Sequence, residues 1–154
     1  MRTLSHYSIL IALISTASLA NCPAVENIAT NCSPSHRQCS WWTSSAAGGA
    51  WEGFVIGPYH GDTAIASFYL AGWWNEGLVN TPTDKPHSSP PIGTTFCYYY
   101  GNKGSLIRMS QGDYGGVPQP QNTNLWHWGI APVGKRLWIC TAGIQECHFE
   151  YGNP

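Results

Sequence analysis

The residues best suited to acid–base chemistry are a few histidines and acids in expected turns and at expected strand ends. His60 and Asp62 share one turn, and the other candidates are His87, Asp84, Asp113 and Glu52. An imidazole near a carboxylate can transfer protons during hydrolysis. The chain, however, has no Gly-x-Ser-x-Gly, no His-Glu-x-x-His and no phosphate-binding glycine loop. A small hydrolase using His60 and Asp62 is therefore the third of three hypotheses, and no residue is assigned as catalytic.

Six cysteines are the other residues that could do chemistry: Cys22, Cys32, Cys39, Cys97, Cys140 and Cys147. Zinc binding would need paired ligands, but there is no Cys-x2-Cys, and His36-x2-Cys39 lacks a matching second half. An even set of cysteines in an exported chain is typical of disulfides rather than of a catalytic thiol. We expect disulfides, with no metal and no cofactor.

The spacing of the cysteines suggests one pairing without proving it. Cys32 and Cys39 enclose six residues, as do Cys140 and Cys147, so each pair can close a local loop. Cys22 and Cys97 would then pair with each other. Six cysteines allow fifteen pairings, and the sequence alone does not choose among them.

The N-terminus has the pattern of an export signal. Arg2 precedes the apolar run 7–19, and Ser18 and Ala20 are the small residues expected before a cleavage site. We expect a signal peptide over 1–20 and a single disulfide-stabilised β domain over 21–154, secreted or periplasmic. The alternative is a lipoprotein anchored at Cys22, but Asn21 is unusual before a lipidated cysteine, and lipidation would leave five cysteines. No second apolar run is long enough for a membrane span.

Composition narrows the range of partners. Only 10% of residues are charged, with seven Lys and Arg against eight Asp and Glu. This balance, without a basic cluster, gives no long-range attraction to nucleic acid or to anionic membranes. We expect neither as a partner.

Eight tryptophans in so short a chain indicate a binding surface, a core rich in indoles, or both. Exposed indoles stack on sugar rings, and neighbouring amides bond the sugar hydroxyls. The leading hypothesis is a non-catalytic exported domain that binds carbohydrate through an aromatic patch. The expected ligand-binding residues are Trp73, Trp74, Asn75, Asn124, Trp126 and Trp128. The alternative is that these rings fill a small β-core.

Runs rich in β-branched and aromatic residues, separated by turn residues, predict a mainly β fold. The expected strands are 54–56, 63–74, 94–100, 105–110, 125–130, 135–142 and 146–151. The segment 21–49 has little periodicity and is expected to be pinned by disulfides, and 111–124 is expected to be a loop. No long helix is evident, so we predict a small antiparallel sandwich or an open barrel stapled by disulfides.

The segment 79–93 contains four prolines and is expected to be an exposed loop. Rigid loops lose little entropy on binding. The second functional hypothesis is therefore a secreted protein-interaction module, an inhibitor or a host-directed factor, that presents this loop to a protein ligand.

Several local motifs resemble a family of small exported bacterial domains of unknown function. They are the Cys22-Pro23 start with Ile28, Phe96-Cys97-Tyr98-Tyr99, and Cys140 followed by Glu146-Cys147-His148-Phe149. The resemblance implies an exported bacterial protein with a small β-fold, and it supplies no catalytic residues. The pair Cys32 and Cys39 and the long proline-rich loop depart from the family's pattern.

Overall fold

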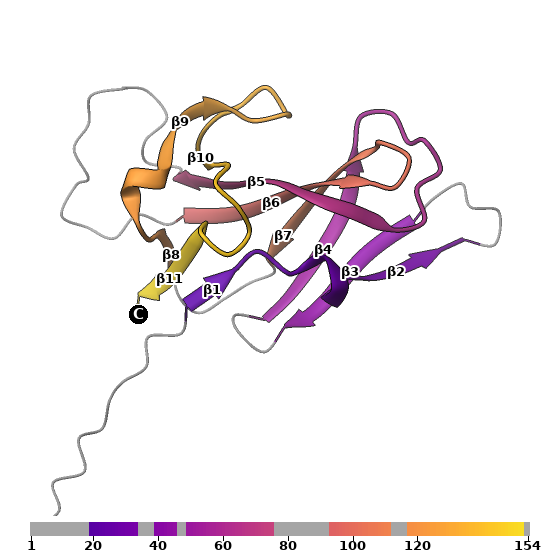
Figure 1. The fold of residues 1–154 in the computed structure, drawn as a ribbon, viewed down its shortest axis with the longest axis horizontal. Helices are drawn as coiled ribbons and strands as arrows, with labels where there is room; N and C mark the ends of the chain where they lie inside the picture. The colour runs from indigo at the N-terminus through magenta and orange to yellow at the C-terminus, as the bar shows by residue number, and fades with distance from the viewer. Residues whose placement is uncertain (1–18, 34–38, 46–48, 76–92, 112–116, 153–154) are drawn as a thin grey trace, which may run out of the picture.

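The computed structural model describes residues 19–33, 39–45, 49–75, 93–111 and 117–152, and these residues form two antiparallel sheets (Figure 1). The strands are β1 (Leu19–Asn21), β2 (Ala29–Cys32), β3 (Cys39–Ser45), β4 (Gly49–Ile56), β5 (Ile65–Asn75), β6 (Gly93–Gly101), β7 (Leu106–Gln111), β8 (Val117–Pro120), β9 (Trp126–Ile130), β10 (Arg136–Cys140) and β11 (His148–Gly152). Two short 3-10 turns, η1 (Val25–Asn27) and η3 (Thr123–Leu125), complete the described elements. The expected mainly β, antiparallel fold is confirmed.

The larger sheet has eight strands in the order β2-β3-β4-β7-β6-β5-β10-β9. Its centre is the hairpin of β6 and β7, which the sequence predicts from two apolar runs flanking Gly101-Asn102-Lys103-Gly104. Gly104 has a φ of 90°, a conformation that favours glycine. Register shifts in β5 leave Tyr69 without a partner on β6, a bulge that bends the strand.

The smaller sheet has the order β1-β11-β8 and lies at the lower left of Figure 1. The expectation of a loop over 111–124 is wrong for β8, which pairs with β11. Pro118 and Pro120 lack the backbone N–H, so this segment fits only at the edge of a sheet, and β8 is an edge strand. The two prolines weaken the strand pattern in the sequence, and β8 forms because β11 supplies its hydrogen-bonding partner.

The segment 21–49 is also more regular than expected, because β2, β3 and the start of β4 lie within it. In β3 the side chains alternate: Cys39, Trp41 and Thr43 are buried, whereas Ser40 and Trp42 are exposed. This period of two marks a strand with one face on a core. The neighbouring residues Trp41 and Trp42 hide this alternation in the sequence, because both are apolar although their side chains point to opposite faces of the sheet.

One face of the large sheet, the inner face, packs under the N-terminal segment and the small sheet. Its buried side chains include Trp41, Trp51, Tyr99 and Trp126. Tyr99 donates a hydrogen bond of 2.7 Å to the carbonyl of Pro23, which fixes the N-terminal segment on the sheet. The opposite face is called the outer face below.

Three disulfides are present, Cys22–Cys97, Cys32–Cys39 and Cys140–Cys147, and they follow the pairing that the spacing favours. Cys22–Cys97 joins the N-terminal segment to the central strand β6, so it holds the cover on the inner face. Three disulfides indicate an extracellular or periplasmic protein.

The expected signal peptide falls almost entirely on residues 1–18, which lie outside the described residues. Leu19 and Ala20, expected to be its last two residues, form backbone pairs with Glu150 and Phe149. Cleavage after Ala20 would leave only Asn21 of β1, and this boundary remains a prediction. The described part of the chain includes no helix with the length and apolar character needed to cross a bilayer.

Candidate binding surface

The outer face carries a row of side chains that begins at an exposed tryptophan. Cross-strand pairing places Trp42 opposite Glu52, Glu52 opposite Ser110, and Ser110 opposite Phe96. Side chains directly opposite in a sheet lie about 4.5–5.5 Å apart at Cβ. The row therefore combines a ring, a carboxylate, a hydroxyl and a second ring across β3, β4, β7 and β6.

A second row runs beside the first, because residues two apart on a strand share a face. It places Phe54 opposite Arg108, and Arg108 opposite Tyr98. Trp42 is 50% exposed and Phe54 46% exposed, which is high for such large apolar rings. We call Trp42, Glu52, Phe54, Phe96 and Arg108 the outer-face cluster.

Arg108 lies between two aromatic rings at the centre of this cluster. Its guanidinium carbon is 4.5 Å from the ring centroid of Phe54 and 5.0 Å from that of Phe96. Both distances are in the range of a cation–π interaction. The two rings orient the guanidinium without neutralising its charge.

The nearest polar group does not neutralise it either. Burial raises the pKa of Tyr98, while the positive charge of the nearby Arg108 lowers it in part. The phenol therefore stays neutral near pH 7. Arg108 Nε and the Tyr98 hydroxyl are buried, and neither atom has a hydrogen-bond partner among the described residues.

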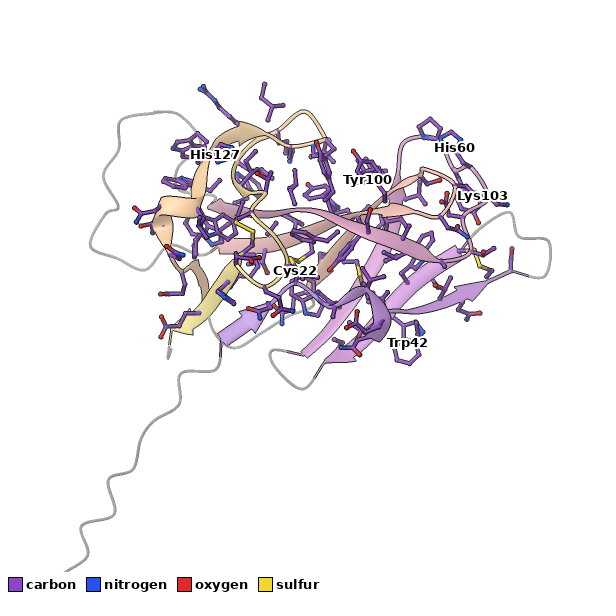
Figure 2. All side chains as sticks on the ribbon, viewed as in Figure 1. Cys22, Trp42, His60, Tyr100, Lys103 and His127 are labelled. Carbon is purple, nitrogen blue, oxygen red and sulfur yellow. A yellow bond between two sulfur atoms is a disulfide. The ribbon has the colours of Figure 1, made fainter. Side chains whose placement is uncertain are left out.

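Two further exposed rings on the outer face form a separate pair. Tyr69, 39% exposed, contacts Tyr100, 40% exposed, with ring centroids 4.9 Å apart. Figure 2 shows Tyr100 toward the upper side of the molecule and Trp42 on the lower side. The sheet curves between them, so the tyrosine pair is not counted in the outer-face cluster.

Two tryptophans of the expected ligand-binding patch are buried in the structure. Trp73 and Trp126 are only 6% and 4% exposed and lie in the inner-face core. Trp126 contacts Phe149 at 5.2 Å, and its indole Nε1 donates a hydrogen bond to the carbonyl of Gln121. Phe149 belongs to the small sheet, so the burial of Trp126 depends on a long-range contact that the sequence does not reveal.

The remaining expected residues do not gather in one place. Trp74 is half-buried on the outer face, where the ammonium of Lys135 lies 4.8 Å from its ring. Trp128 is half-buried on the inner face beside Trp138, at 5.5 Å. Asn124 is exposed in η3, and the side chain of Asn75 lies outside what the structure describes.

Asp62 holds a turn rather than facing a cleft. Its carboxylate accepts hydrogen bonds from the backbone N–H groups of Lys103 and Ser105, and it is fully buried. His60 is exposed, and its backbone N–H bonds the Ser105 hydroxyl. These contacts tie the β4–β5 loop to the β6–β7 turn, at the upper right of Figure 2. Of the other candidate acids and histidines, Asp84, His87 and Asp113 lie outside the described residues.

The described part of the chain lacks a cluster of metal-ligating side chains. No group of three or more His, Cys, Asp or Glu side chains there is arranged to hold a metal ion. All six cysteines are in disulfides, so none is available as a thiolate ligand.

Sequence reasoning missed the outer-face cluster because its members are far apart in the chain. One signal was present: the exposed partner of the Trp41-Trp42 pair should point away from the core. Nothing local, however, places Trp42 near Arg108, since the contact depends on the pairing of β3, β4 and β7.

No protein-family model matches the chain, and no similar curated protein or solved structure was found.

Proposed function

We propose that the protein is an exported, non-catalytic binding domain that recognises carbohydrate through the outer-face cluster. The observation that carries the proposal is the exposure of two large rings, Trp42 and Phe54, on a sheet face with polar side chains between them. Isolated exposed apolar residues are common, but clustered ones mark binding surfaces. Trp42 and Phe54 would stack on sugar rings, while Glu52 and Ser110 bond hydroxyls.

This proposal moves the sugar site from the tryptophans expected at β5 and β9 to those rings that solvent reaches. As expected from the sequence, aromatic rings in a chain of low charge would bind the ligand. The three disulfides fit a domain that works outside the cell, where durability matters.

A test needs variants that remove the rings without unfolding the domain. Trp42→Ala and Phe54→Ala should each weaken sedimentation with insoluble polysaccharide, or weaken soluble oligosaccharide binding, by about five-fold or more, since truncating a ring that carries binding energy costs about 1 kcal/mol or more. Ile130→Ala is the matched control, because Ile130 is 73% exposed but lies on β9. Unchanged melting temperatures would show that the losses are local. Wild-type affinity in both ring variants would refute the proposed site.

A protein-interaction module is the second candidate function. Tryptophan, tyrosine and arginine also dominate the binding energy of protein interfaces, and the outer-face cluster contains Trp42 and Arg108. The proline-rich loop proposed for this role, 79–93, lies outside the described residues except for Gly93. Capture of a protein that depends on Trp42, with no binding to any polysaccharide, would favour this function over the first.

A further inference from the structure

We infer that the ligand of the outer-face cluster is an acidic saccharide, whose carboxylate is bound by Arg108. The inference rests on the proposed function and specifies its ligand. The observation behind it is a half-buried cation that lies between two aromatic rings and whose Nε has no hydrogen-bond partner among the described residues.

Arg108 is positioned by its neighbours but left with unused hydrogen-bonding capacity. Phe54 and Phe96 contact the guanidinium through their rings and accept no conventional hydrogen bond. Arg108 Nε is buried and unpaired. A guanidinium carries four further N–H donors on its two terminal nitrogens, which the aromatic rings do not satisfy. A bound anion would accept hydrogen bonds from these donors.

The charges around Arg108 indicate where that anion lies. Among the described acidic residues on the outer face, Glu52 is the nearest to Arg108 in the strand pairing. It lies opposite Ser110, which is two residues from Arg108 on β7. Its charge disfavours an anion on the Trp42 side. On the other side lies Tyr98, which is neutral but fully buried, so a ligand cannot reach Arg108 from there. We therefore place the ligand's anionic group at the solvent-facing end of the Arg108 guanidinium, with the sugar ring toward Phe54 and Trp42.

A carboxylate suits this site better than a bulkier anion because the guanidinium is planar. A carboxylate can accept two parallel N–H bonds from one edge of an arginine. Phe54 and Phe96 lie 4.5 and 5.0 Å from the guanidinium carbon, and a planar carboxylate needs less room beside them than a tetrahedral sulfate or phosphate. Hexuronic acids carry a carboxylate on a pyranose ring, and they combine the two features that the cluster recognises.

The decisive comparison uses one glycan backbone with and without charge. Binding of oligogalacturonate and of its methyl ester to wild-type protein would be measured by calorimetry at low and high salt. The acid should bind about ten-fold or more tightly than the ester, and its affinity should fall as salt rises. Equal affinity for acid and ester would overturn the inference but leave the proposed function standing. Binding of neither, nor of any other polysaccharide, would remove both.

Variants then assign the preference to one side chain. Arg108→Gln should remove the preference for the acid, while Arg108→Lys, which keeps the charge but loses the planar fork, should retain only part of it. Circular dichroism and the melting temperature would check folding. If Arg108→Gln does not fold, the wild-type acid and ester comparison still decides. A preference for a sulfated over a carboxylated oligosaccharide, or for poly-glutamate over both, would also overturn the assignment.

Discussion

The turn held by Asp62 gives the sharpest prediction about stability. Burial raises the pKa of Asp62, but hydrogen bonds from Ser105 and from the backbone N–H of Lys103 outweigh burial and lower the pKa below its ordinary value. Asp62→Asn keeps the shape but supplies one oxygen for two backbone donors. Each hydrogen bond to a charged acceptor contributes about 1.5–3 kcal/mol. We expect Asp62→Asn to lower the free energy of unfolding by about 3 kcal/mol, which corresponds to about 10 °C in melting temperature.

The pH dependence follows from the direction of the shift. A carboxyl with a lowered folded-state pKa stabilises the protein above its unfolded pKa, and this contribution is lost as pH falls through the folded-state pKa. The gap in melting temperature between the wild-type protein and Asp62→Asn should be widest near pH 6–7 and shrink below about pH 4. Calorimetry at several pH values measures it. A gap of zero at pH 7, or one that does not change with pH, would refute the reasoning.

Gly101 provides an independent check on the same turn. A Cβ at Gly101 would overlap the Asp62 carboxylate. Gly101→Ala should therefore displace Asp62 and lower the melting temperature in the wild-type background. Gly101→Ala should lower the melting temperature less in the Asp62→Ala background, where only the Cβ of the overlapping side chain remains, so the two effects should not add.

Two further outcomes test the inner face. Replacing both Cys22 and Cys97 by alanine should lower the free energy of unfolding by up to about 4.5 kcal/mol, the chain-entropy figure for a separation of 75 residues. The double variant should also expose the segment around Pro23 to protease. An unchanged denaturation midpoint would contradict the structural role of this bridge. Trp126→Ala should cost about 3–5 kcal/mol because a buried indole leaves a cavity, whereas Trp42→Ala should cost under about 1 kcal/mol. Similar losses in the two variants would show that their burial is misassigned.

The sequence predicts the fold well where its signals are local. Apolar runs bounded by glycine and proline locate the β6–β7 hairpin, and two short cysteine spacings agree with the disulfides of the structure. β8 was missed because Pro118 and Pro120 weaken the strand pattern, and its pairing with β11 is a tertiary effect. β3 was missed because adjacent tryptophans hid the alternation.

The sequence predicts the kind of binding site, one made of aromatic rings, but not its position on the fold. The excess of tryptophan indicates recognition by aromatic rings, but which rings are exposed depends on the cover over the inner face. Trp126 is buried by Phe149, a residue 23 positions along the chain that reaches it through the smaller sheet. Arg108 meets Phe54 through strand register, which no local pattern encodes.

The central claim is that carbohydrate binds the outer face at β3, β4, β6 and β7, and amide chemical-shift mapping tests it most directly. The oxidised protein labelled with nitrogen-15 would be titrated with soluble oligosaccharides, neutral and acidic. The account predicts saturable shifts centred on Trp42, Phe54 and Arg108, including the indole signal of Trp42. Shifts centred on β8 and β11, or no shifts with any oligosaccharide, would contradict it.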